Sequence, residues 1–119
     1  MDAIDKFKLA LPRIRREIEV YELYTARFQN VKHMVKAHHF YQIAKEQFER
    51  ELNSVRNYLR DNLKGHLNHL DDTYNDFSKL LMDEIIDLDS VTREEIEGLL
   101  KEIDVLINIS KNHLALLKL

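Results

Sequence analysis

Apolar residues recur every three or four positions along most of the chain, which is the spacing of one face of an α-helix. In the N-terminal third the stripe runs without a slip through Ile4, Phe7, Leu11, Ile14, Ile18, Tyr21, Thr25 and Phe28. Pro12 lies inside this stripe. Either one helix is kinked at Pro12, or a short leading helix ends near Ala10 and a second begins with Pro12 in its first turn. The unbroken stripe favours the kinked helix.

The end of this first helix carries no glycine or proline. We place a turn between residues 29 and 41, because one helix from residue 12 to residue 64 would be about 80 Å long. The apolar spacing nevertheless continues, so one long helix in an extended coiled-coil dimer is the alternative; the positions that continue it are Val31, Met34, His38, Tyr41, Ala44 and Phe48. His38 and His39 fall at the predicted turn, where we expect solvated side chains.

Two later boundaries complete the predicted topology. The second helix is predicted to end near Gly65, and the third to restart within residues 66–72. The fourth begins at a capping box formed by Thr92 and Glu95, with Val91 and Ile96 as a hydrophobic staple. The sequence thus predicts an all-α, up-and-down four-helix bundle in one domain spanning residues 1–119, with helices at roughly 2–36, 40–64, 67–88 and 92–118.

Composition agrees with a helical protein and narrows the candidate chemistry. The 119 residues include two glycines and one proline, too few for the tight turns of a β-protein. The absence of cysteine excludes disulfides, zinc–thiolate sites and a thiol nucleophile. No apolar run reaches the roughly 18 residues of a membrane span, and the N-terminus does not read as a signal peptide. We therefore expect a cytoplasmic protein without a membrane partner.

Charge is unevenly distributed along the chain. Residues 1–70 carry 13 basic and 9 acidic side chains, and residues 71–119 carry 5 and 12. Basic and acidic helices lying side by side are the simplest explanation; a nucleic-acid surface is disfavoured because the whole chain is acidic, with a net charge of −3. Arg56, Arg60 and Lys64 recur every fourth residue, and such like charges need an opposing partner. We expect that partner to be the acidic side of the third or fourth helix, for example Asp83, Glu84 and Asp87, with RNA or a phosphate ligand as the alternative.

The segment from Arg60 to His66 resembles the Arg-polar-x(3 to 5)-His signature of HEPN-domain ribonucleases. That family consists of small all-helical dimers that cleave RNA without a metal. The resemblance implies that Arg60 binds the scissile phosphate and that His66 transfers a proton. Six residues on a straight helix place two side chains about 120° apart, so their convergence would require a bend near Gly65. On the apolar stripe, His66 is otherwise a core or rim side chain.

Residues 61–65 are also similar to the His-x-x-Lys-Gly core of histidine phosphotransfer domains, which are four-helix bundles of this size. Asp61 stands where that family has its phosphorylated histidine. The resemblance therefore implies at most a non-phosphorylated relative that docks a partner protein.

Metal and cofactor sites find little support in the sequence. His66, His69 and Asp72 are spaced by three and could line one side of a helix, but no fourth ligand is close in sequence. The chain lacks Glu-x-x-His and His-x-x-x-His, the spacings that serve metal sites in helical bundles. We expect no cofactor and no dedicated metal site.

Polar residues interrupt the apolar seams at Thr25, Asn62, His66, Ser110 and His113. Such interruptions commonly fix helix register or oligomeric state. The five tyrosines supply either core packing or hydrogen-bonding edges for an interface; they are Tyr21, Tyr24, Tyr41, Tyr58 and Tyr74. The favoured hypothesis is a non-catalytic interaction, assembly or regulatory module that binds a protein partner and self-associates. The competing hypothesis is a HEPN-like ribonuclease using Arg60 and His66.

Overall fold

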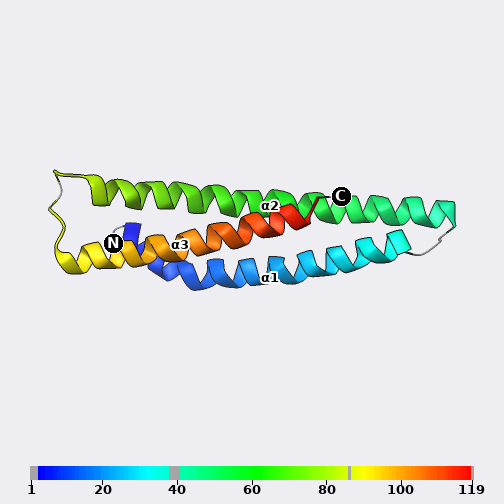
Figure 1. Ribbon diagram of the computed structural model, residues 1–119, viewed down its shortest axis with the longest axis horizontal. Coiled ribbons are helices and arrows are strands. Elements are labelled where there is room, and N and C mark those ends of the chain that lie inside the picture. Colours follow the sequence, from blue (N-terminus) through cyan, green and yellow to red (C-terminus); the bar gives the residue numbers. More distant parts are fainter. Residues whose placement is uncertain (1–2, 38–40, 86, 119) are drawn as a thin grey trace.

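The computed structural model describes residues 3–37, 41–85 and 87–118 and contains three helices, α1 (Ala3–Ala37), α2 (Gln42–Met82) and α3 (Ser90–Leu116). They run up, down and up in an elongated molecule of 67 × 21 × 20 Å (Figure 1). The described part of the chain is all-helical, as predicted, but has three helices where the sequence predicted four. None of these helices combines the length and the hydropathy needed to cross a bilayer.

Helix α1 follows the predicted stripe. All of its predicted apolar positions are buried except Tyr21, which is half-buried. The helix continues across Pro12, so no separate leading helix exists. Figure 1 shows the dark-blue first turns of α1 at an angle to the rest of the helix. Because α1 ends at Ala37 and α2 begins at Gln42, the predicted turn is confirmed and the single long helix is excluded. His38 and His39 lie outside the described residues.

The predicted helix break at Gly65 is wrong, because α2 runs straight through it. Gly65 has no positive φ. A glycine in a helix interior costs about 1 kcal/mol relative to alanine. On either side of it, Leu63 and Leu70 are both 0% exposed, and burial of one leucine contributes about 1.5–3 kcal/mol. Continuing the helix keeps both leucines on one buried stripe, so packing outweighs the local preference of glycine for a turn.

A first prediction follows for Gly65→Ala. A Cβ built at Gly65 meets no atom within 4 Å, so alanine fits the helix without strain. We expect the free energy of unfolding to rise by about 0.5–1 kcal/mol, measured by urea denaturation. Gly98→Ala is the matched control, since it is also helical and also has nothing within 4 Å of the added Cβ. Loss of stability in Gly65→Ala alone would show that the chain turns at this position.

The boundary between α2 and α3 also differs from its prediction. Helix α2 ends at Met82, where the Asp83 side chain accepts a hydrogen bond from the Ile85 N–H at 2.9 Å. Ile85, which was predicted to continue the third helix, is 93% exposed. Such a bond from an aspartate to the backbone two residues later is typical of a turn. The acidic residue therefore stops the helix before its apolar pattern is exhausted.

Helix α3 begins three residues earlier than the predicted capping box. Its N-cap is Asp89, whose Oδ1 accepts a hydrogen bond from the Thr92 N–H at 2.6 Å. This backbone hydrogen bond lowers the pKa of Asp89 below its ordinary value. Aspartate ranks above threonine as an N-cap, which explains the shift. Val91, the predicted staple residue, is consequently exposed.

The buried core consists of two apolar clusters. The larger lies among all three helices and contains Phe7, Ile14, Leu70, Phe77 and Ile103, among others. The smaller contains Phe28, Leu52, Leu59, Leu63 and Leu117. Helix α3 has 27 residues against 41 in α2, so it ends partway along the molecule and the α1–α2 hairpin extends beyond it (Figure 1). Helix α3 therefore leaves part of the α1–α2 pair uncovered.

Candidate functional site

A series of three clefts follows the seam between α1 and α2, on the side away from α3. No described α3 residue lines any of them. Along α1 their lining residues advance by three or four positions from Ala3 to Val31, which defines one continuous face of that helix. Lys8 and Arg15, which pair with Glu95 and Glu102 of α3, lie on the opposite face. We call this open seam the α1–α2 groove.

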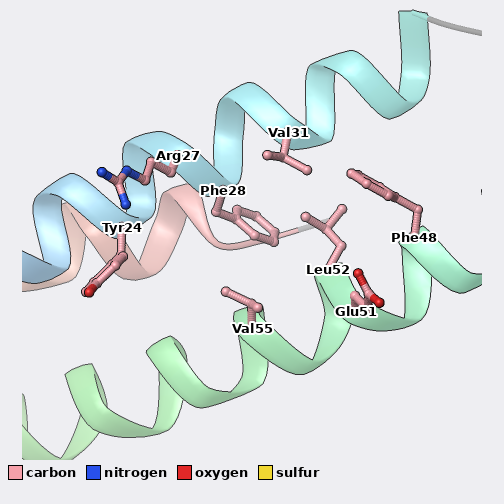
Figure 2. Close-up of a pocket in the computed structure, with 8 residues that line it drawn as sticks. All are labelled: Tyr24, Arg27, Phe28, Val31, Phe48, Glu51, Leu52 and Val55. Atoms are coloured by element: carbon pink, nitrogen blue, oxygen red, sulfur yellow. The ribbon is translucent and has the colours of Figure 1, made fainter.

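The groove has an apolar floor and exposed apolar walls. One of the three clefts has a volume of about 360 Å³. Figure 2 shows Phe28, Leu52 and Val55 of this cleft pointing into the gap between α1 and α2. The residues that line it are Tyr24, Arg27, Phe28, Val31, Phe48, Glu51, Leu52 and Val55. The neighbouring cleft shares Tyr24 and adds Val20, Tyr21 and Tyr58. Exposed large apolar side chains gather here, including Val20 (48%), Tyr24 (45%), Val55 (49%) and Tyr58 (68%). Water therefore contacts apolar surface along much of this seam.

His66 lies in the same seam and bridges the two helices. Its Nε2 is 3.0 Å from Glu17 Oε2, and its ring centroid is 5.4 Å from that of Tyr21. Burial raises the pKa of Tyr21 above its ordinary value, and the nearby Glu17 carboxylate and Tyr58 raise it further. The histidine thus joins α2 to α1, and its predicted place at the rim of an apolar seam agrees with this contact.

Arg60 lies on another side of α2, toward α3. Its guanidinium lines a cleft between these helices, and its Nε is 3.6 Å from Asp61 Oδ1 on the same helix. Within one chain the structure does not bring Arg60 and His66 together, because the unbroken helix separates residues six positions apart by about 120°. The ribonuclease hypothesis stays a prediction. Asp61, the other residue singled out by resemblance, is exposed.

The predicted acidic partner of the ridge Arg56, Arg60 and Lys64 is wrong. Asp83, Glu84 and Asp87 lie between α2 and α3, beyond the last turn of α2. The residues that share a cleft with the ridge include Lys111 of α3 and Lys118 just after it, which are also basic. Helix register explains the error, because the last acidic residue of α3 is Asp104 and the ridge faces the turns after it.

The three residues considered as metal ligands, His66, His69 and Asp72, do not form a common metal site among the described residues. Among the described residues no group of three or more histidine, aspartate and glutamate side chains could hold a metal ion. His66 contacts Glu17, His69 lines the α1–α2 groove and Asp72 is exposed.

Three predicted polar interruptions form a buried layer between the two apolar clusters. Thr25 and Ser110 are 0% exposed and His113 is 8% exposed. The ion pairs Lys8–Glu95 and Arg15–Glu102 both join residues 87 positions apart (95 minus 8, and 102 minus 15), so α1 and α3 are parallel and Thr25 is level with residue 112. Among the described residues the Thr25 and Ser110 hydroxyls and both His113 nitrogens have no hydrogen-bond partner.

A second prediction concerns this layer. An unsatisfied buried polar group costs about 1–3 kcal/mol, whereas an apolar group of the same shape does not. We expect Thr25→Val to raise the free energy of unfolding by at least about 1 kcal/mol in urea denaturation. Thr73→Val is the control, because the Thr73 hydroxyl donates a hydrogen bond to the His69 carbonyl at 2.9 Å and should give no gain. Destabilisation in Thr25→Val would mean that its hydroxyl is bonded in the folded protein.

Two of the five tyrosines, Tyr24 and Tyr58, are exposed along the α1–α2 seam. The sequence left open whether these tyrosines serve core packing or an interface. Val20 and Val55 were missed as surface residues. The available signal was a second apolar stripe on α1, beside the first, formed by Val20, Tyr24 and Val31. A helix with two adjacent apolar stripes has more than one neighbour to contact.

Comparison of the chain with protein families, with curated proteins and with solved structures finds no significant match.

Proposed function

We propose that this protein is a non-catalytic assembly module whose protein partner is a second copy of the same chain, bound along the α1–α2 groove. The carrying observation is the groove itself, an apolar-floored seam open on the face that α3 leaves uncovered. Contiguous exposed apolar surface of this kind is typical of a protein–protein interface. Its tyrosines and arginines are residue types enriched in the interior of interfaces.

Two copies facing each other across a twofold axis parallel to the helices would form an intermolecular four-helix bundle. Each α1 would lie over α2 of the other copy, in antiparallel orientation and at the same level along the axis. Antiparallel neighbours are the arrangement of up-and-down bundles, and a twofold interface is the commonest symmetry of soluble oligomers. Both α3 helices would remain on the outside. The sequence predicted a four-helix bundle within one chain. In the proposed dimer, α1 and α2 of two copies would form the four helices of such a bundle.

Charges on the two rims of the groove support this pairing. Arg27 on α1 and Glu51 on α2 line the same cleft, and Lys6 and Asp76 line another. Residues that share a cleft lie at one level, so the twofold axis carries Arg27 of one copy toward Glu51 of the partner copy. Lys6 likewise meets Asp76 of the partner copy. A groove with one basic and one acidic rim is therefore complementary to itself.

The size of the groove is sufficient for a stable dimer. From Ala3 to Val31 the α1 face is about 42 Å long, and two adjacent helices are about 20 Å wide. The resulting footprint is about 800 Å² on each copy, which is the usual size of a specific interface. Burial of the exposed valines and tyrosines supplies the main driving force.

Sedimentation velocity over nanomolar to high micromolar concentrations tests the proposal. We expect a reversible monomer–dimer equilibrium. No larger species should form, because a twofold dimer buries the groove of both copies. A single-chain mass throughout this range would refute the proposal.

A further inference from the structure

We propose a second binding site, in the cleft between α2 and α3, for a compact ligand that carries several phosphate groups. The cleft has a volume of about 450 Å³, within the range of small-molecule sites. Three basic side chains of α2, one of α3 and one just after α3 line it, and no carboxylate of a described residue does; the five are Arg56, Arg60, Lys64, Lys111 and Lys118. This site is separate from the α1–α2 groove and does not depend on the proposed dimer.

The surrounding protein leaves this charge largely unneutralised. In the described parts of the chain, Asp61 is the one carboxylate within 4.0 Å of any of the five basic side chains. It contacts Arg60, and the side chains of both residues are exposed to solvent. The last carbonyls of α3 also attract cations, but a helix C-terminus is equivalent to only about −0.5 of a charge. Two residues beyond the end of α3, the Lys118 carbonyl already accepts a hydrogen bond from the Lys32 ammonium at 2.7 Å. Five cations therefore exceed the negative charge that the described residues place beside them.

The two arginines are available to hold an anion. The Nε atoms of Arg56 and Arg60 have no hydrogen-bond partner among the described residues, and one terminal guanidinium nitrogen of Arg56 donates to Asn57 Oδ1 at 3.1 Å. Guanidinium groups match phosphate oxygens with paired N–H donors, and ammonium groups add point charges. Like charges at four-residue intervals destabilise a helix unless an anion lies between them. An anion bridging Arg60 and Lys111 would join α2 to α3.

Charge density selects the class of ligand. One carboxylate carries a single negative charge and a monophosphate ester between one and two, both well below five. A triphosphate chain concentrates several charges in a volume that the cleft accommodates. Inorganic polyphosphate and the tail of a nucleoside triphosphate share this chemistry. Leu114 and Ala115 add apolar lining beside the cations, against which a nucleoside could pack.

Isothermal titration of the full chain with inorganic tripolyphosphate tests the site. We expect one binding event per chain, accompanied by a higher Tm, and affinity at least about tenfold lower in both Arg60→Gln and Lys111→Gln, since each removes a charged contact. Lys101→Gln removes an exposed cation of α3 outside the cleft and should change neither quantity. Lys111 is exposed, so its replacement tests the site even if Arg60→Gln alters the fold.

Parallel titrations distinguish the two sources of the ligand. ATP binding more tightly than tripolyphosphate would assign a nucleotide, and equal affinity would assign a bare polyphosphate chain. Two results would overturn the proposal. One is an equal loss of affinity in Lys101→Gln and Arg60→Gln, which indicates diffuse attraction. The other is binding of single-stranded RNA without any binding of tripolyphosphate, which indicates a nucleic-acid surface.

Discussion

Replacement of Phe77 by alanine is expected to lower the free energy of unfolding by about 3–5 kcal/mol, measured by urea denaturation at fixed protein concentration. Phe77 is 1% exposed, and its ring packs edge-on against Phe7 of α1, with 5.6 Å between the ring centroids. Truncation removes this contact and leaves a cavity in the larger apolar cluster. Small domains are stable by about 5–15 kcal/mol, so much of the stability would be lost.

Ile85→Ala is the control for this substitution. Ile85 is 93% exposed in the turn after α2, so its truncation should change the free energy of unfolding by no more than about 0.5 kcal/mol. Similar losses in Phe77→Ala and Ile85→Ala would contradict the packing of Phe77 of α2 against Phe7 of α1.

Val55→Asp is expected to raise the dimer dissociation constant by at least about 100-fold, because it places a charge among the apolar side chains that the proposed interface buries. In the single chain Val55 is 49% exposed, so the new carboxylate stays solvated and the helices remain folded. Sedimentation velocity measures the dissociation constant, and far-UV circular dichroism confirms that helicity is retained.

Val105→Asp is the matched control for the interface. Val105 is similarly exposed, at 56%, but lies on α3 and lines none of the α1–α2 clefts. Its replacement should leave the dissociation constant unchanged. If both aspartate variants associate like the original chain, the α1–α2 groove is not the interface.

The helical class and much of the helix pattern were predictable from local spacing. The stripe from Ile4 to Phe28 identified the buried face of α1, and the turn after Ala37 followed from the length of chain that a compact fold can accommodate. Gly65 was misread because glycine is a local signal for a turn, whereas the burial of Leu63 and Leu70 that overrides it is a tertiary effect. The shift from Thr92 to Asp89 as N-cap was a choice between two acceptable capping residues.

The candidate sites depended on information that spacing does not contain. The sequence singles out Arg60 and His66 as candidate site residues. Which residues lie next to each of them depends on the continuity of α2 and on the register of α3. The total charge of the C-terminal half predicted acidic partners for the ridge Arg56, Arg60 and Lys64. The register between α2 and α3 instead brings Lys111 to the cleft that the ridge lines, and Lys118 lines the same cleft. The α1–α2 groove exists because α3 covers only one face of a helix pair, which follows from three-dimensional packing.

The central claim is tested most directly by mixing two charge-reversed variants, Arg27→Glu and Glu51→Arg, in sedimentation velocity. Each variant alone should be largely monomeric, because the twofold axis brings like charges together at both contacts. An equimolar mixture should restore the dimer, since every reversed residue then meets its opposite on the partner copy. This recovery cannot arise from contacts within one chain. Continued dimerisation of both separate variants, or a monomeric mixture, would contradict association through the α1–α2 groove.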